Sequence, residues 1–245
     1  MLNPEKIIAE FNRIRNLGYI SSNRTGNTGI GKTFEDHLGV IENNVKDPDF
    51  DGFEVKSQRT LAKSPITLFT KSPTHPANAN EYLKQTFGKP DNMFPQHLVL
   101  HPSIFTTRDT LVHNEYRFRL VIDNEQERIT IVVKDIDTGA VINDSVYYAF
   151  CDIQLMKLYK LFVVWADTKV EDGQEYFHFT KAKIYYGITF DKLLEFIESG
   201  LIQFDIRFGV YKSGKLAGRK HDHGSGFRLK KRYLSEFFEN TLEID

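Results

Sequence analysis

The chain has 245 residues, of which 40% are apolar and 13% aromatic, enough for a sizeable hydrophobic core in one large domain or two smaller ones. No apolar run approaches the roughly 18 residues of a membrane span, and no hydrophobic signal segment follows the first residues. A single cysteine, Cys151, excludes an internal disulfide. We therefore expect a soluble cytoplasmic protein that keeps Cys151 as a buried thiol.

The N-terminal region predicts a helix over residues 4–18, because Ile7, Phe11 and Ile14 recur at helical spacing and Gly18 follows them. The polar residues 21–31 predict a loop. Residues 26–33 fit G-x-x-x-x-G-K-[ST], the pattern of a nucleotide-binding P-loop. A P-loop follows a buried strand, and the polar residues before this one do not predict such a strand. Helix capping is therefore the main interpretation, and a P-loop NTPase stays open as an alternative.

A second helix is predicted over residues 32–41, and it carries Glu35. Two acids and a lysine follow it. Asp51-Gly52 predicts a turn, and the alternation of Phe53-Glu54-Val55-Lys56 predicts a strand with Glu54 and Lys56 on one face. Asp49 and Glu54 offer the hard oxygens that Mg²⁺ prefers, and Lys56 can orient an attacking water. This stretch predicts metal-assisted hydrolysis of a phosphodiester, with Asp51 open as an alternative to Asp49.

The middle of the chain predicts both strands and helices without an internal repeat. Strands are predicted at 66–70, 116–123 and 129–134, a short helix at 80–87, a helical segment at 155–159, a hairpin from 161–166 and 176–186, and an amphipathic helix at 190–199. This mixture predicts an α/β protein with a mixed sheet.

The C-terminal region is basic although the net charge is −1. Residues 207–232 hold nine Lys or Arg residues against one acid, Asp222. A strand over 204–211, a glycine-containing loop and a return strand over 227–230 predict a platform for DNA. Arginine and lysine donate to guanine, and aspartate accepts from cytosine. The predicted DNA contacts are Arg207, Tyr211, Lys212, Arg219, His221, Asp222, His223, Arg228 and Lys230. Metal binding or a structural turn stays open for the two histidines.

Several of these stretches together resemble a known family. The spacing from Pro48-Asp49 to Glu54-Val55-Lys56 matches the PD-(D/E)XK signature of nucleases, and the glycine-rich stretch with Glu35 precedes it as in the MutH group. With the C-terminal platform, the chain is most similar to the MvaI/BcnI restriction endonucleases, and to their MvaI branch in particular. The resemblance implies a PD-(D/E)XK core and a MutH-like two-lobed cleft, with a catalytic lobe over about residues 1–165 and a recognition lobe over about 166–245.

The same resemblance implies the roles of individual residues. Asp49, Glu54 and Lys56 would be the catalytic trio with Glu35 as an accessory acid, and Mg²⁺ would be held by Asp49, Glu54 and Val55. A type II restriction endonuclease of this kind would act as a monomer, nicking each strand of double-stranded DNA at CC(A/T)GG. A cognate methyltransferase would protect the DNA of the prokaryotic host. A MutH-like repair nickase and a non-catalytic DNA-binding module stay open as alternatives.

Overall fold

The computed structural model describes residues 2–40 and 47–244. The chain divides into two compact units, each built from separate segments. Unit 1 comprises Met1–Ser64, Leu155–Thr189 and Arg232–Asp245, and unit 2 comprises Pro65–Gln154 and Phe190–Lys231. These boundaries differ from the single division expected near residue 165. The physical reason is a parallel strand pair in unit 1, described below, because parallel strands require a long crossover, and here the crossover contains the first segment of unit 2.

Unit 1 contains three helices, five strands and a short 3₁₀ segment within the described residues. They are α1 (Glu5–Arg15), β1 (Ile20–Ser21), α2 (Gly29–Leu38), β2 (Glu54–Arg59), η2 (Met156–Leu158), β11 (Lys160–Glu171), β12 (Gln174–Tyr186), α5 (Leu234–Phe237) and β15 (Asn240–Ile244). The 3₁₀ segment η4 (Lys231–Tyr233) leads from unit 2 into α5.

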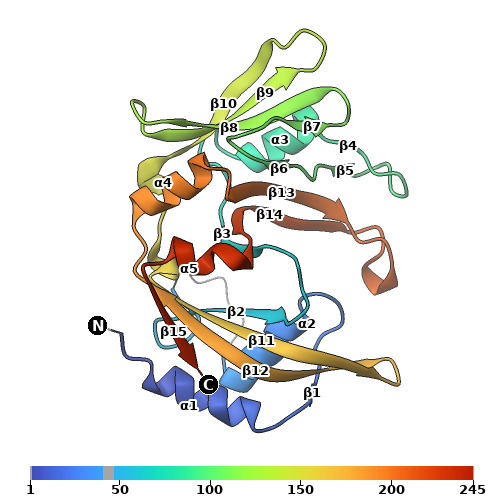
Figure 1. The fold of residues 1–245 in the computed structure, drawn as a ribbon. Helices are drawn as coiled ribbons and strands as arrows, with labels where there is room; N and C mark the ends of the chain where they lie inside the picture. The colour runs from blue at the N-terminus through green and yellow to red at the C-terminus, as the bar shows by residue number, and fades with distance from the viewer. Residues whose placement is uncertain (1, 41–46, 245) are drawn as a thin grey trace. The chain divides into compact units, whose positions relative to one another are not determined.

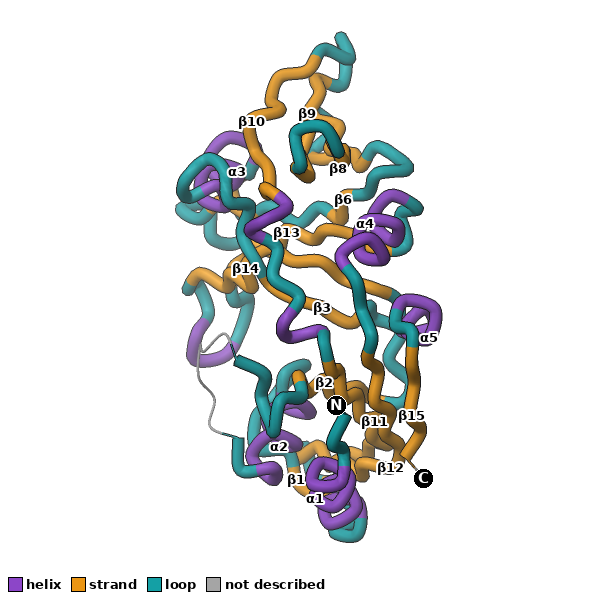
Figure 2. Tube along the Cα trace, turned by 90° about the vertical axis from the view of Figure 1, so that its left-hand side faces the viewer, coloured by secondary structure: helices purple, strands orange, loops and turns teal. Residues whose placement is uncertain are grey.

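The sheet of unit 1 is mixed, with strand order β1-β12-β11-β2 and β15 also paired with β12. Only β2 and β11 run parallel. Helices α1 and α2 lie side by side against the sheet (Figure 1, Figure 2), where Phe11 and Phe34 pack on Phe162 with ring centroids 6.1 and 6.2 Å apart. Val55 belongs to this same core. Because side chains alternate along a strand, the neighbours of Val55 on β2 face the other side of the sheet.

Unit 2 contains two helices and ten strands within the described residues. They are β3 (Ile66–Thr70), α3 (Ala79–Phe87), β4 (Lys89–Pro90), β5 (Leu98–Val99), β6 (Ser103–Ile104), β7 (Thr110–Val112), β8 (Tyr116–Asp123), β9 (Arg128–Asp135), β10 (Val141–Ala149), α4 (Phe190–Glu198), β13 (Ile202–Val210) and β14 (Lys220–Leu229). The 3₁₀ segments η1 (Phe150–Asp152) and η3 (Gly214–Leu216) complete it.

Unit 2 combines two four-stranded sheets, with orders β10-β9-β8-β7 and β3-β14-β13-β6, and the ribbon β4-β5. Every strand pair in it is antiparallel. Tyr148 of β10 contacts Phe204 and Phe227 of the second sheet, with centroids 5.7 and 5.4 Å away. Phe87 of α3 meets Phe118 of β8 edge to face at 5.4 Å. Aromatic side chains therefore join the two sheets and α3 into one core.

Most predicted elements are confirmed within a few residues. The helices at 4–18, 80–87 and 190–199 and the strands at 66–70, 116–123 and 129–134 are present, and the mixed α/β class is confirmed. Residues 155–159 contain a 3₁₀ turn instead of an α-helix, and β10 and β15 were not predicted. The prediction of a buried thiol is wrong, because Cys151 lies exposed in η1, where the neighbouring Phe150 packs on Phe190 instead.

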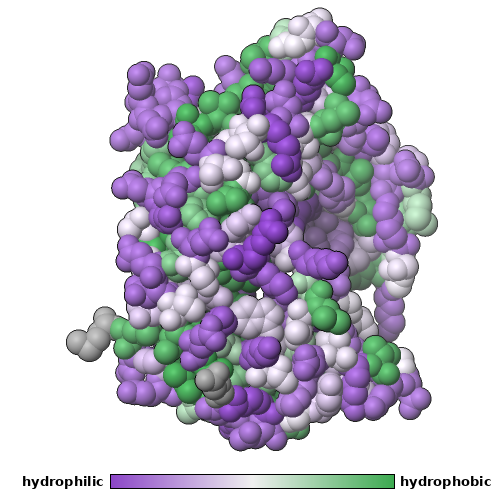
Figure 3. Space-filling model, in the orientation of Figure 1, coloured by the Kyte–Doolittle hydropathy of each residue, from purple (hydrophilic) through white to green (hydrophobic). Residues whose placement is uncertain are grey.

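No described helix is long and apolar enough to cross a membrane. On the face shown in Figure 3, hydrophilic residues predominate and hydrophobic ones form smaller areas between them.

Candidate active site

The approach to β2 is a two-residue turn, Asp51-Gly52, in which both residues have positive φ, 49° and 80°. Such a pair suits an Asp-Gly turn between antiparallel segments. It folds the chain back so that Asp49 lies beside β2, where its Oδ2 accepts a hydrogen bond from the amide of Val55 at 2.9 Å. Asp51 is exposed at the turn. Asp49 is thus the acid fixed next to Glu54.

Glu54 is a buried carboxylate faced by two ammonium groups. Its relative exposure is 4%. Lys56 Nζ lies 2.5 Å from Oε1, and Lys157 Nζ lies 3.5 Å from Oε2. A buried charge is costly unless it is paired, so the two lysines make ionised Glu54 tolerable at this position. Lys157 comes from η2, immediately before β11, and no local pattern in the sequence marked it.

The oxygen atoms around Glu54 fit a divalent cation. Glu54 Oε2 is buried and accepts no hydrogen bond from the described residues. The amide and carbonyl of one strand residue point to the same side of the strand. Because the Val55 amide points to Asp49, its carbonyl lies on that edge as well. No cluster of three or more His, Cys, Asp or Glu side chains with metal-binding geometry occurs in the described residues. The two carboxylates and the carbonyl are oxygen donors of the kind that Mg²⁺ binds, and this ion takes its other ligands from water and substrate.

Glu35 lies on α2, half-buried, and α2 packs against β2. This helix begins at Gly29 and ends at Leu38, so it starts earlier than predicted, and residue 41 lies outside the described residues. Lys32 Nζ pairs with Asp36 Oδ1 at 2.7 Å. The hydrogen bonds from Lys32 and then Asn23 lower the pKa of Asp36.

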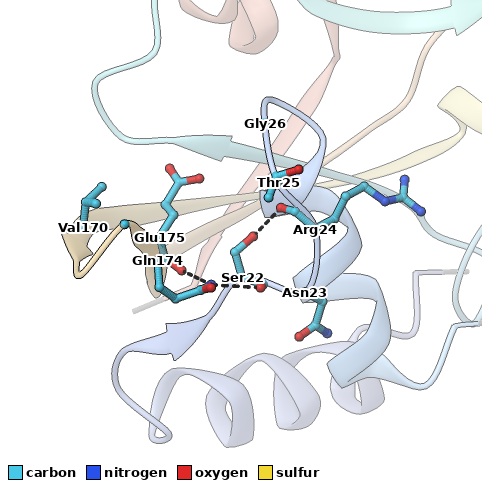
Figure 4. Close-up of a pocket in the computed structure, with 9 residues that line it drawn as sticks. Ser22, Asn23, Arg24, Thr25, Gly26, Val170, Gln174 and Glu175 are labelled. Carbon is cyan, nitrogen blue, oxygen red and sulfur yellow. Dashed lines mark hydrogen bonds between the residues drawn. The ribbon is translucent and has the colours of Figure 1, made fainter. Parts of the chain in front are cut away.

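The P-loop-like stretch has a different structure from a P-loop. Its last five residues, from Gly29 to Thr33, are helical, and Thr33 Oγ1 accepts a hydrogen bond from the amide of Asn23 at 3.0 Å. The preceding strand, β1, is a two-residue antiparallel edge strand. Figure 4 shows the loop of residues 22–26, which lines a cavity of about 480 Å³ together with the tip of the β11–β12 hairpin. In that loop Ser22 Oγ donates to the Arg24 carbonyl at 2.7 Å. The short antiparallel strand argues against nucleotide binding. Thr28, at the N-terminus of α2, makes no side-chain capping hydrogen bond.

A bulge in β14 decides which way the predicted DNA-binding residues point. The pairing of β13 with β14 leaves Arg207 opposite both His223 and Gly224. Gly224 has φ +67°, and a Cβ there would lie 3.2 Å from Thr70 Cγ2. Glycine adopts this conformation without strain. Because the bulge inserts one residue, it shifts the alternation of side chains along β14.

The shift divides the predicted residues between the two faces of the sheet. We call one of them the polar face of β13–β14; it carries Gln203, Asp205, Arg207, Gly209, His221, His223 and Arg228. On it His221 stacks on Tyr211, with centroids 3.9 Å apart, and meets His223 at 4.1 Å. Asp222 pairs with Phe208 and lies on the opposite face. The three consecutive residues 221–223 therefore do not form one surface.

The two arginines of the polar face are held by protein groups. Arg228 Nη1 lies 2.6 Å from Asp205 Oδ2, and its Nη2 donates to the Pro65 carbonyl at 2.9 Å. Arg207 Nη2 donates to the His223 carbonyl at 2.9 Å. Burial, followed by the neighbouring Arg228 charge, lowers the pKa of Arg207. The Nε of each arginine is buried without a hydrogen-bond partner in the described residues. Arg228 thus has a structural partner for each terminal nitrogen.

Asp222 has a partner that the sequence did not indicate. Lys84 of α3 lies with its Nζ 3.3 Å from Asp222 Oδ2. The remaining predicted contacts are at the surface: Arg219 and Lys230 are exposed, and Lys212 pairs with Asp91.

Comparison with known proteins gives a consistent result. The family described as MvaI/BcnI restriction endonuclease matches residues 8–238. The solved structure "Restriction endonuclease MvaI-cognate DNA substrate complex" shares 36% identity, with 100% of each chain covered and a TM-score of 0.92. "Restriction endonuclease MvaI in the absence of DNA" also shares 36% identity, covers 98% of this chain and 97% of that one, and has a TM-score of 0.59.

A search of curated proteins found no match. The family match nevertheless spans most of the chain, and the similarity to solved structures extends over its full length. The chain is therefore a member of the MvaI/BcnI family of restriction endonucleases, which are site-specific deoxyribonucleases.

Proposed function

We propose that this protein is a type II restriction endonuclease that hydrolyses DNA phosphodiesters with Mg²⁺ at a short G·C-rich site. One observation carries the proposal. The buried carboxylate of Glu54 has Oε1 2.5 Å from Lys56 Nζ, and its Oε2 lies 3.5 Å from Lys157 Nζ and accepts no hydrogen bond from the described residues. Asp49 accepts a hydrogen bond from the amide of Val55, the next residue along β2. Two carboxylates and a lysine close together at the start of β2 are the groups that metal-assisted hydrolysis needs.

Each side chain then has a defined task. Asp49, Glu54 and the carbonyl of Val55 would hold Mg²⁺, which supplies Lewis-acid polarisation of the phosphate when bound. Lys56 orients the attacking water and stabilises the negative charge that develops on the phosphate oxygens as the P–O bond breaks. Lys157 balances the charge of Glu54, and Glu35 supports the site from α2.

For DNA recognition we propose that the polar face of β13–β14 and the adjoining loop read base edges. Arg207, Arg219, His221 and His223 offer hydrogen-bond donors to guanine. Asp222 lies near the start of β14 on the other face of the sheet, and we propose that it adds an acceptor for the cytosine amino group. Tyr211 supports His221 by stacking on it, and Asp205 holds Arg228 in place. Lys212 and Lys230 suit contacts to phosphates.

In this proposal unit 1 is the catalytic lobe, with the PD-(D/E)XK core around β2, and unit 2 is the recognition lobe. The complex of MvaI with its cognate DNA substrate supports DNA as the substrate here. The family resemblance supports the site CC(A/T)GG, action as a monomer that nicks each strand in turn, and a cognate methyltransferase in the same prokaryotic cytoplasm.

The test is plasmid digestion with Mg²⁺ or EDTA, followed by sequencing of the ends. We expect discrete fragments from one short site with Mg²⁺ and intact plasmid with EDTA. Lys56→Ala should abolish cleavage, whereas Lys63→Ala, which removes an exposed lysine beyond the end of β2, should cut like the wild type. Plasmid that stays intact in Mg²⁺ would contradict the proposed activity, and ends at many unrelated sequences would contradict its site specificity.

A further inference from the structure

Lys84 of α3 is a buried lysine. Its relative exposure is 6%. Its Nζ lies 2.8 Å from Glu81 Oε2 on the same helix and 3.3 Å from Asp222 Oδ2 on β14, and it sits 5.7 Å from the centroid of the Phe208 ring. One ammonium group thus links α3 to the segment of β14 that contains the predicted DNA contacts.

The ammonium group stays charged in this setting. Burial acts to lower the pKa of Lys84, but the hydrogen bond to Glu81 and the charges of Asp222 and Glu81 outweigh it, and the net pKa is raised. Lys84 is therefore a cation throughout the neutral pH range, with two carboxylates to hold.

The contact leaves half of the Asp222 carboxylate for another partner. Both the ion pair and the hydrogen bond engage Oδ2, and Oδ1 accepts no hydrogen bond from the described residues. The Asp222 side chain is 33% exposed, so Oδ1 is within reach of a ligand. An ionised carboxylate with one oxygen fixed can only accept hydrogen bonds, and the major groove offers such a donor in the cytosine N4 amino group.

We propose that Lys84 is a positioning residue for DNA specificity, which holds Asp222 Oδ2 so that Oδ1 meets the N4 amino group of one cytosine in the target. This inference rests on the proposed function. Lys84 itself does not touch DNA. Without it, Asp222 would lie beside Glu81 with no intervening cation, and like charges repel. The carboxylate would then turn away from its present direction, and selection for cytosine at that position would weaken.

The test uses the full-length protein and duplexes in which each target cytosine is replaced in turn by 2-pyrimidinone, which lacks the amino group. Cleavage rate constants under single-turnover conditions are measured for wild type, Lys84→Met, Asp222→Asn and the double variant. The cleavage rate constant of the wild type should fall by about 5- to 150-fold when one particular cytosine is replaced, which is the range of a specific base contact. Lys84→Met and Asp222→Asn should each reduce this discrimination to near unity at the same cytosine, and the double variant should lose no more than either single one.

Two controls separate positioning from folding. Lys84→Arg keeps a cation and should restore most of the discrimination. Lys192→Met removes a lysine of α4 that lies 3.0 Å from Glu195 and should discriminate like the wild type. Asp222→Asn changes a partly exposed side chain. It therefore tests the contact between Asp222 and cytosine even if Lys84→Met lowers the stability of the fold.

The outcomes are distinct. Two results would overturn the role of Lys84 while leaving the proposed function intact. In the first, Lys84→Met discriminates between cytosine and 2-pyrimidinone as strongly as the wild type. In the second, the double variant loses as much discrimination as the two single variants combined. Wild-type protein without any sequence preference would overturn the proposed function and this inference together.

Discussion

Replacing Asp205 by alanine tests whether Arg228 has a structural role. Asp205 is 4% exposed. Its carboxylate accepts hydrogen bonds from Arg228 Nη1 at 2.6 Å and from Gln203 Nε2 at 2.7 Å. Removing one member of a buried pair costs about 3–5 kcal/mol because the other charge stays buried. Arg228 would keep the Pro65 carbonyl, and its side chain is 21% exposed, so we expect the lower end, about 3 kcal/mol.

The assay is urea unfolding of the full chain followed by circular dichroism. Trp165, the only tryptophan, lies in β11, so its fluorescence reports unit 1 separately. With a slope of about 3 kcal/mol per molar urea, Asp205→Ala should lower the midpoint of the unit 2 transition by about 1 M. The double variant Asp205→Leu/Arg228→Met removes both charges of this pair and should be more stable than Asp205→Ala.

A midpoint within about 0.2 M of the wild type, or a double variant destabilised by the sum of the single effects, would refute this reasoning. The comparison also matters for DNA recognition. A loss of specificity in Arg228→Met alone would not establish a base contact, because the same substitution leaves Asp205 as an unpaired buried carboxylate.

Three further predictions concern other parts of unit 2. Gly224→Ala should lower the free energy of unfolding by about 1–2 kcal/mol in urea titrations, because alanine is strained at positive φ, and stability equal to the wild type would contradict the bulge. Burial and the Lys89 charge lower the pKa of His113, so the folded state binds fewer protons than the unfolded one. The melting temperature should therefore fall as pH drops below about 6.5, and more steeply than in His113→Asn. Lys230→Ala should reduce the slope of log binding constant against log salt concentration by about 1, as loss of one phosphate contact does, and an unchanged slope would exclude that contact.

The local part of the candidate site was predictable from the sequence. The Asp51-Gly52 turn and the alternation of Phe53, Glu54, Val55 and Lys56 are short-range signals, and the structure has this turn and these faces. Turn chemistry and pleat depend only on neighbouring residues, so they can be read from one strand.

The missing parts depend on contacts between distant segments. Lys157 and Lys84 reach their acids from other elements, and a lysine far along the chain has no local mark of its partner. Residues 221–223 lie in β14, where ordinary alternation puts Asp222 on the face opposite His221 and His223. The bulge at Gly224 then puts Arg228 on the same face as the two histidines, and its position depends on the pairing with β13. The interleaved units follow from the parallel pairing of β2 with β11, which the sequence of either strand alone does not encode.

The central claim is that Asp49, Glu54 and Lys56 form the catalytic centre. The most direct measurement compares single-turnover cleavage by Asp49→Asn with that by Asp51→Asn, while DNA binding is followed separately in EDTA. We expect Asp49→Asn to cut about a thousandfold more slowly, a loss of about 4 kcal/mol in transition-state stabilisation, with DNA binding retained. Asp51→Asn changes the exposed turn residue and should stay within about threefold of the wild type. Equal rates for the two variants, or a large loss in Asp51→Asn alone, would contradict the assignment of the site.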